Sequence, residues 1–281
     1  MADQHPAIAQ GRAAVVTGGA SGIGLAAAKR FATLGMKVAI ADLNEEALHE
    51  ASADLTAAGA PDVITEAVDV SDIAAVQRFK DRVYAGFGEV AVLMNNAGRG
   101  GGGSAIENYA GWQKVLATNL WGVINGVQAF VPAMIAQGTQ AVVVNTGSKQ
   151  GITTPPGDTA YNVSKAGVKV LTEGLQHTLR NTPGCKVTAY LLVPGWVHTG
   201  LTAAAGAPKP AGAWWPDQIV DVLLSRLAKG DFYIICEDND VTNALDFKRI
   251  AWAAGDITEN RPPLSRWHPD YKDAFAAFLK N

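Results

Sequence analysis

Apolar runs of strand length alternate with longer stretches of helical character along the chain. Runs such as AVVV at 141–144 are apolar throughout, as expected of strands covered by helices on both faces. The predicted strands are Ala13 to Val16, Lys37 to Ala41, Val63 to Val68, Val90 to Met94, Ala141 to Asn145, Lys186 to Val193 and Phe232 to Ile235. The predicted helices lie near residues 22–34, 44–58, 72–86, 108–137, 159–180 and 217–229. This order predicts an α/β fold of the Rossmann type, a doubly wound parallel sheet of seven strands with helices on both faces.

We expect a single domain over residues 1–281, with its core at 12–235 and a C-terminal helical extension at 236–281. The extension holds 14 charged residues in 46 but keeps several large apolar side chains, so we predict surface helices docked by a few aromatic residues. The segment 202–213 consists almost entirely of Ala, Gly and Pro. Such residues have little to bury, so this segment is predicted to be a mobile loop that closes over a ligand.

The stretch from Val115 to Ser148 has no charged side chain, a property that membrane spans share. Polar and helix-breaking residues interrupt it, namely Asn119, Asn125, Gln128, Pro132, Gln137 and Gly138. We interpret it as a buried helix that leads into a buried strand. The uncharged helix at 115–137 is also suited to a subunit interface, so we expect a homo-oligomer, either a dimer or a tetramer.

Composition limits the partners that the protein is expected to have. The net charge is −3 and no block of Lys and Arg occurs, so we expect neither nucleic acid nor a membrane as a partner. The only cysteines, Cys185 and Cys236, are too few for a disulfide framework and fit a reducing compartment. The first residues lack a basic region followed by an apolar core, so we expect no signal peptide and a cytoplasmic protein.

Glycines follow the first predicted strand directly, at Gly18, Gly22 and Gly24. Glycine lets the backbone turn sharply and approach a pyrophosphate, whose charge a helix N-terminus favours. Asp42 ends the second strand, where a carboxylate accepts hydrogen bonds from a free ribose 2′-hydroxyl and repels a 2′-phosphate. The pattern therefore predicts a dinucleotide site that prefers NAD to NADP. A purely structural turn, and an N-cap role for Asp42, remain alternatives.

Tyr161 and Lys165 are four residues apart and therefore lie on one face of a predicted helix. A cation on the same face stabilises a phenolate, which would lower the pKa of the tyrosine. Taken alone, this spacing is more typical of a solvated helix surface. It gains weight from Ser148 at the end of the preceding strand and from Asn119 in the helix before it.

At these residues the sequence resembles the short-chain dehydrogenase/reductase family, in its single-domain NAD-dependent branch. The motifs that carry the resemblance are TGGASGIG (17–24), Asp69 and Val70 in DVSD, NNAG (95–98), Asn119 in NLWG, NTGS (145–148), YNVSK (161–165) and PGWVHT (194–199). They occur in order from about residue 12 to about 235. Two departures stand out, TGS in place of the frequent SS pair and a long tail after the last predicted strand.

The resemblance implies roles for four catalytic residues. Tyr161 would act as general base when an alcohol is oxidised and as general acid when a ketone is reduced. Ser148 would hydrogen-bond the reacting oxygen. Lys165 would lower the pKa of Tyr161 and bind the nicotinamide ribose, and the carbonyl of Asn119 would hold a water that links Lys165 to solvent.

The resemblance also implies a set of cofactor-binding residues. They are Gly18, Ser21, Gly22, Ile23, Gly24, Asp42, Asp69, Val70, Asn96, Ala97, Gly98, Tyr161, Lys165, Pro194, Gly195, Val197 and Thr199. The NNAG segment could equally be a turn that stabilises the central sheet. No second His or carboxylate stands near His198 at metal-ligand spacing, so no metal is predicted.

Trp196 and Trp214 are predicted to line the substrate site, which favours a neutral, hydrophobic or ring-bearing secondary alcohol or ketone. They could instead close the core or an interface. Lys149 and Gln150 could contact a polar substrate. The function predicted is an NAD-dependent oxidoreductase that interconverts a secondary alcohol and a ketone. A non-catalytic NAD-binding sensor or scaffold, and an epimerase or dehydratase with internal oxidation, are the alternatives.

Overall fold

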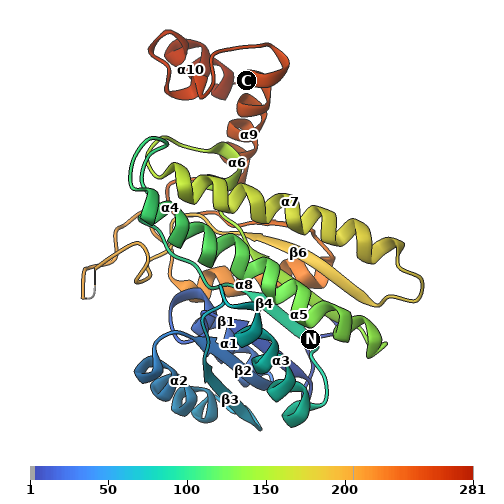
Figure 1. Cartoon of the computed structure of the whole chain (residues 1–281). Coiled ribbons are helices and arrows are strands. Elements are labelled where there is room, and N and C mark those ends of the chain that lie inside the picture. The colour runs from blue at the N-terminus through green and yellow to red at the C-terminus, as the bar shows by residue number, and fades with distance from the viewer. Residues whose placement is uncertain (1–3, 205, 281) are drawn as a thin grey trace.

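A seven-stranded parallel sheet forms the centre of the molecule, in the order β3-β2-β1-β4-β5-β6-β7 (Figure 1). The computed structural model describes residues 4–204 and 206–280. The strands are β1 (Ala13–Thr17), β2 (Lys37–Asp42), β3 (Val63–Ala67), β4 (Val92–Asn95), β5 (Ala141–Thr146), β6 (Val187–Val193) and β7 (Tyr233–Ile235). The chain reverses its winding direction between β1 and β4, where ligands bind in open sheets of this type. The predicted Rossmann-type fold is confirmed.

Helices cover both faces of the sheet. They are α1 (Gly22–Thr33), α2 (Glu45–Ala57), α3 (Ile73–Phe87), α4 (Tyr109–Leu116), α5 (Gly122–Ala136), α6 (Gln150–Thr153), α7 (Thr159–Asn181) and α8 (Pro216–Lys229). Alternate strand residues separate into two apolar cores, as the twofold period of a strand requires. Val16, Ile40 and Met94 pack with α1, α2 and α8, whereas Val15 and Leu93 pack on the other face with α3, α5 and α7.

The predicted single helix at 108–137 is interrupted in the structure. A π-helical turn, Ala117–Trp121, separates α4 from α5. Such turns add one residue to a helix and occur frequently at functional sites. The short helix α6, directly after Ser148, was not predicted because four residues carry no periodic pattern.

The run Tyr109–Ala136 is the one helical stretch in the described part of the chain that is long and apolar enough to cross a membrane. Half of its most apolar window is buried inside the fold. On α5, Val127, Phe130, Val131 and Met134 belong to the apolar core beneath the sheet. The length and apolarity of this helix are therefore accounted for by its place in the core.

The C-terminal extension consists of helices that stand away from the body of the protein (Figure 1). They are α9 (Asn243–Thr258), two 3₁₀ turns (Ser265–Trp267 and Pro269–Tyr271) and α10 (Lys272–Lys280). Trp252 is the centre of this unit, because Phe275 and Phe278 pack edge-on against its ring and the Arg261 guanidinium lies 4.0 Å from the ring centroid. The predicted C-terminal helices are confirmed, and their aromatic residues pack these helices against one another.

Candidate active site

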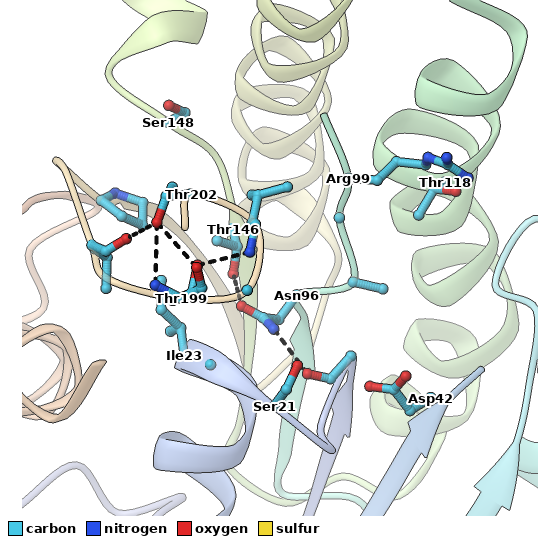
Figure 2. Close-up of a pocket in the computed structure, with 18 of the residues that line it drawn as sticks. Ser21, Ile23, Asp42, Asn96, Arg99, Thr118, Thr146, Ser148, Thr199 and Thr202 are labelled. Atoms are coloured by element: carbon cyan, nitrogen blue, oxygen red, sulfur yellow. Dashed lines mark hydrogen bonds between the residues drawn. The ribbon is translucent and has the colours of Figure 1, made fainter. Parts of the chain in front are cut away.

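A cavity of about 590 Å³ opens at the carboxyl ends of the central strands, and Figure 2 shows its lining. Asp42 and Ser148 lie at opposite ends of the residues drawn there. Of the predicted cofactor and catalytic residues, the cavity is lined by Gly18, Ser21, Gly22, Ile23, Asp42, Asp69, Val70, Asn96, Ala97, Gly98, Ser148, Tyr161, Lys165, Pro194, Gly195, Val197 and Thr199. Gly24 and Asn119 lie behind this lining. The sequence motifs, which are spread over about 180 residues, therefore meet in one place.

The turn between β1 and α1 requires glycine for two different reasons. Gly18 and Gly22 have left-handed backbones, with φ of +62° and +53°. Gly24 packs so closely that a Cβ atom would overlap the carbonyl oxygen of Gly18. Ser21 is the N-cap of α1, and its side chain makes no capping bond to the described residues. The first residues of α1 line the cavity, and the free N–H groups of a helix N-terminus suit the pyrophosphate of a dinucleotide.

Asp42 is held at the end of β2 by backbone groups. Its Oδ1 accepts from the N–H of Leu43 at 2.8 Å, and its Oδ2 accepts from the N–H of Ala20 at 3.2 Å. The N-cap of α2 is Asn44, which accepts from the N–H of Ala47 at 3.1 Å. The alternative role of Asp42 as that N-cap is therefore wrong. Its carboxylate lines the cavity.

Three strand ends are joined around Asn96. The Thr17 hydroxyl accepts from the N–H of Asn96 at 3.0 Å, and Nδ2 of Asn96 donates to the carbonyl of Gly18 at 3.3 Å. The Thr146 hydroxyl donates to Oδ1 of Asn96 at 3.2 Å (Figure 2). The NNAG segment thus stabilises the sheet and also lines the cavity. Thr17 and Thr146 were missed in the sequence, although each is a hydroxyl residue at a strand end directly before glycine-containing turns.

Ser148 and Tyr161 both line the cavity. The Ser148 Oγ accepts from the backbone N–H of Gln150 at 3.1 Å. Burial raises the pKa of the Tyr161 phenol, the neighbouring Ser148 hydroxyl opposes that shift, and Asp158 adds to it. The net direction for Tyr161 is upward in the isolated chain.

Lys165 is buried, with 3% exposure, and donates from Nζ to the carbonyl oxygen of Thr146 at 2.8 Å. Its Nζ lies 5.8 Å from the centroid of the Tyr161 ring. Burial lowers the pKa of Lys165 to about 8. The expected lowering of the Tyr161 pKa by Lys165 is not seen in the isolated chain, because desolvation dominates both groups.

Asn119 lies within the π-helical turn and is fully buried. Its Oδ1 accepts from the N–H of Arg99 at 2.8 Å, and its Nδ2 donates to the carbonyl of Arg99 at 2.9 Å and to the Ser164 hydroxyl at 3.1 Å. A Cβ on Gly98 would lie 3.6 Å from both Oδ1 of Asn119 and Nζ of Lys165. Asn119 therefore fixes the backbone that follows NNAG, directly beside Lys165.

Asp158 is a further residue at the site that the sequence analysis missed. Its Oδ1 caps α7 by accepting from the N–H of Tyr161 at 3.1 Å. Its Oδ2 accepts from Gly101 at 2.9 Å and Gly102 at 3.1 Å, which ties down the glycine-rich segment after β4. An acidic residue three positions before Tyr161, at a predicted helix start, was the available signal.

The four residues predicted to contact substrate are all described, and none of them lines this cavity. Lys149 is bound by two carboxylates, and Gln150 is exposed at the start of α6. Trp196 and Trp214 lie on adjoining segments, with the N–H of Trp214 donating to the carbonyl of Trp196 at 2.8 Å. The Trp214 indole donates to Oδ1 of Asn239 at 3.0 Å.

Part of the predicted lid is also tied down by the chain after β7. Nδ2 of Asn239 donates to the carbonyl of Ala211 at 2.5 Å, and its backbone N–H donates to Gly212 at 3.0 Å. Lys209 donates to the carbonyl of Ala213 at 2.6 Å. Residue 205 lies outside the described residues. Thr199 to Thr202, at the start of this loop, line the cavity (Figure 2).

Comparison with known proteins agrees with this geometry. The family model for short chain dehydrogenase matches residues 12–210. A 1-deoxy-11-beta-hydroxypentalenate dehydrogenase from Streptomyces exfoliatus is 37% identical over 264 residues, covering 92% of this chain and 94% of the relative. A 2,5-dichloro-2,5-cyclohexadiene-1,4-diol dehydrogenase from Sphingobium indicum is 34% identical over 194 residues, covering 69% and 76%. The chain therefore belongs to the short-chain dehydrogenase family of oxidoreductases.

Solved structures agree on the fold but differ in the cofactor that they hold. A short-chain dehydrogenase/reductase from Burkholderia phymatum in complex with NAD is 34% identical, with a TM-score of 0.81 and coverage of 90% of this chain and 96% of that one. A metagenomic short-chain oxidoreductase in complex with NADP is 30% identical, with a TM-score of 0.68 and coverage of 82% and 98%. The two neighbours thus each hold a nicotinamide dinucleotide, NAD in one and NADP in the other.

Proposed function

We propose that the protein is an NAD-dependent oxidoreductase that interconverts a ring-bearing secondary alcohol and its ketone. The observation that carries this proposal is the meeting of Ser148, Tyr161 and Lys165 on one cavity whose other end holds Asp42. A sensor or scaffold would need the glycine turn and Asp42 but not a serine, a tyrosine and a buried lysine in the wall of the same cavity. The presence of all three favours a catalyst over a binding module.

When it is bound, the dinucleotide supplies a hydride acceptor for oxidation or a hydride donor for reduction. The chain supplies the acid–base chemistry. Tyr161 takes the hydroxyl proton of the alcohol or returns one to the ketone, and Ser148 hydrogen-bonds the same oxygen. Lys165, held toward Tyr161 by the carbonyl of Thr146, contributes positive charge that favours the phenolate. Asn119 fixes the segment at Gly98 beside Lys165.

The preference for NAD is supported by Asp42. Its carboxylate lines the cavity and keeps acceptor capacity, because its Oδ2 accepts one backbone N–H at 3.2 Å and a carboxylate oxygen has two lone pairs. A 2′-hydroxyl can donate to it, whereas a 2′-phosphate would meet a like charge. The relative from Burkholderia phymatum holds NAD.

The proposal of a ring-bearing substrate rests on the two relatives, whose names specify a hydroxypentalenate and a cyclohexadiene diol. Val197 and Leu201 add apolar surface to the lining of the same cavity. Lys149, the nearest cation in sequence to Ser148, is neutralised by carboxylates and offers no free charge to a polar substrate. Apolar lining of this kind fits the ring that both names share.

We further propose a cytoplasmic homo-oligomer, in which residues 12–235 form the catalytic core and 236–281 an extension of the same domain. Support for the oligomer comes from exposed apolar side chains on α7 and on the π-helical turn between α4 and α5. Trp121, in that turn, is 56% exposed, and Val163 and Val170, on α7, are 43% and 65% exposed. Large apolar side chains exposed on neighbouring elements are typical of subunit interfaces.

The test is the absorbance of reduced nicotinamide while the protein is offered NAD or NADP with cyclohexanol, 1-indanol, 2-octanol and glycerol. We expect NADH to form with NAD and the cyclic alcohols, and little reaction with glycerol. NADPH forming faster than NADH would overturn the cofactor assignment. Binding of NAD by calorimetry without turnover of any alcohol or of the matching ketones would favour the sensor or the internal-oxidation alternative.

A further inference from the structure

Lys149 directly follows Ser148, yet its side chain turns away from the cavity into a buried ionic cluster. Its Nζ lies 2.6 Å from Oδ2 of Asp246 and 3.4 Å from Oδ2 of Asp238. The side chains of Lys149, Asp246 and Asp238 are only 17%, 6% and 8% exposed. Arg249 approaches Oδ1 of Asp246 at 4.0 Å. Both carboxylates come from the segment after β7, with Asp246 on α9, so the extension meets the body of the protein at this cluster.

Burying these charges carries a large desolvation cost, and buried ion pairs are often no better for stability than apolar side chains of equal size. Burial raises the pKa of Asp246, and Lys149 and Arg249 oppose that shift. Such pairs do restrict conformation, because a buried charged side chain that leaves its partner loses its compensating charge. The cluster therefore fixes where Lys149 lies relative to α9.

The position of Lys149 also determines the position of Ser148, because the two residues are adjacent and belong to the same hydrogen-bonded turn. Its carbonyl accepts from the N–H groups of Ile152 at 3.1 Å and Thr153 at 3.0 Å, which starts the short helix α6. The N–H of Gln150, in the same turn, donates to Ser148 Oγ at 3.1 Å. A Cβ on Gly151 would lie 2.5 Å from the backbone carbon of Lys165, so α6 has no free space on its catalytic side.

Asp238 contacts a second segment of the cavity wall, the one that contains Gly195. Its Oδ2 accepts from the backbone N–H of Trp196 at 3.3 Å. A Cβ on Gly195 would lie 2.6 Å from that oxygen and 3.0 Å from Nζ of Lys149. Gly195 lines the cavity, as Ser148 does. The ionic cluster of Lys149, Asp238 and Asp246 therefore contacts both the segment that carries Ser148 and the segment that carries Gly195.

We propose that Lys149, Asp246 and Asp238 are positioning residues through which the C-terminal extension holds Ser148 in place in the cavity wall that it shares with Tyr161. This inference rests on the proposed catalytic role of Ser148. The extension is then part of the catalytic apparatus, although its described residues lie outside the wall of the cavity. It acts on the orientation of the serine and leaves the dinucleotide end unchanged.

The diagnostic variant is Asp246→Asn, assayed with NAD and 1-indanol. We expect kcat to fall about tenfold, the order of one hydrogen bond to a charged group, with the KM for NAD within twofold of wild type. We also expect a rise in the pKa that governs the limb on which kcat increases with pH, because unprotonated Tyr161 is the base for alcohol oxidation and Ser148 lowers its pKa. Removing a negative charge near the site would by itself lower that pKa, so an upward shift identifies loss of the serine contact.

A double-mutant cycle with Ser148→Ala separates this inference from the proposed function. If Asp246 acts through Ser148, Asp246→Asn has little further effect on kcat once the hydroxyl is gone. Equal effects of Asp246→Asn with and without Ser148 would overturn the inference and leave the function intact. A Ser148→Ala enzyme of wild-type activity would instead overturn the catalytic role of Ser148.

Asp256→Asn is the matched control, because Asp256 forms a similarly buried ion pair with Arg261 at 3.1 Å in the same extension. We expect it to lower the melting temperature with kcat unchanged, and Asp246→Glu to restore much of the activity. If Asp256→Asn lowered kcat as much as Asp246→Asn, general loosening of the extension would be the cause. A titration of Tyr161 at 295 nm, as the difference from Tyr161→Phe, gives the pKa shift without any alcohol and decides the case where 1-indanol is not oxidised.

Discussion

The two ends of the cavity are built in different ways. At the dinucleotide end, Thr17, Gly18 and Asn96 are fixed by hydrogen bonds between side chains and backbone groups of neighbouring strand ends. At the substrate end, Ser148 sits beside Lys149, whose partner Asp238 lies 89 residues away in the sequence. The first end needs only a correctly formed sheet, whereas the second also needs side-chain contacts with the extension. Changes to the extension should therefore alter catalysis while leaving dinucleotide binding nearly constant.

Tyr161 is where the two ends meet, so its replacement is expected to have the largest effect. Tyr161→Phe removes the ionisable hydroxyl and keeps the ring, and we expect kcat to fall by about 10²- to 10⁴-fold, the usual contribution of a positioned acid–base group. The dissociation constant for NAD, measured by calorimetry, should stay within a few-fold of wild type. Tyr84→Phe, which changes a half-buried phenol far along the chain, is the control. Activity of Tyr161→Phe within about tenfold of wild type would contradict the assignment.

The dinucleotide end could be predicted from the sequence because its chemistry is local. Glycines that need positive φ must directly follow a strand, and Asp42 must end one, so linear spacing is enough to find them. Tyr161 and Lys165 share a helix face, which spacing also reveals. These residues meet on one wall once the parallel sheet forms, since the carboxyl ends of its strands share an edge.

The substrate end could not be predicted in the same way. Lys149 and Trp214 are residue types that suit a ligand site. Nothing near them in the sequence reveals that Lys149 pairs with Asp246 and that Trp214 donates a hydrogen bond to Asn239. The π-helical turn around Asn119 was missed because it changes the helical register by one residue without changing composition. Long-range side-chain pairing and irregular backbone are the two features that periodicity does not encode.

Removing the centre of the extension would show whether the extension is separable from the dinucleotide end. Trp252 is 5% exposed, and its indole donates to the Ser265 hydroxyl at 2.7 Å. We expect Trp252→Ala to lower the free energy of unfolding of the extension by about 3–5 kcal/mol, as for other buried aromatic residues. Trypsin should then cleave after Arg249 and Arg266. The affinity for NAD should stay near that of wild type, and kcat should fall toward the Asp246→Asn value.

Trp267→Ala is the control for this change, because Trp267 is 39% exposed and stacks on the surface against Arg266. It should leave the trypsin pattern and kcat almost unchanged. A loss of NAD affinity in Trp252→Ala as large as its loss of kcat would show that the two ends are not independent.

A change confined to the dinucleotide end should give the converse result. Asp42→Ala removes the carboxylate that favours a 2′-hydroxyl and repels a 2′-phosphate, so the preference for NAD over NADP is expected to fall about 10- to 100-fold, the range of one or two charged hydrogen bonds. The kcat with saturating NAD should change little. The measurement is the ratio of kcat/KM for the two cofactors with 1-indanol.

Glu45→Ala makes the same change in charge three residues later, at an exposed position in the first turn of α2. It should leave the cofactor preference within about twofold, because surface charges are screened by solvent. An equal change of preference in both variants would mean that net charge near the site, rather than contact with Asp42, selects the cofactor.

The smallest expected effect concerns the stability of the protein and the buried charge of Lys165. Its pKa is lowered from 10.5 to about 8 by burial, so at pH 7 the folded chain carries a buried charge that the unfolded chain keeps in water. Wild-type stability should therefore rise between pH 8 and 10.5, as the folded protein releases this proton first. Lys165→Met removes the charge, and we expect it to raise the free energy of unfolding at pH 7 by about 1–3 kcal/mol, since one pKa unit is about 1.4 kcal/mol.

Urea unfolding at pH 7 and pH 9.5 measures this difference, and the gain should shrink at the higher pH. Lys169→Met, one turn further along α7, is the control because Lys169 is one-third exposed and pairs with Glu173 at the surface; its effect should stay within about 0.5 kcal/mol. If Lys165→Met is less stable than wild type at pH 7, the bond from Lys165 to the Thr146 carbonyl outweighs the cost of burying the charge. Lys165 would then belong with the backbone-fixed groups of the dinucleotide end. A more stable variant without activity would show that the protein keeps a destabilising charge because the reaction at Tyr161 requires it.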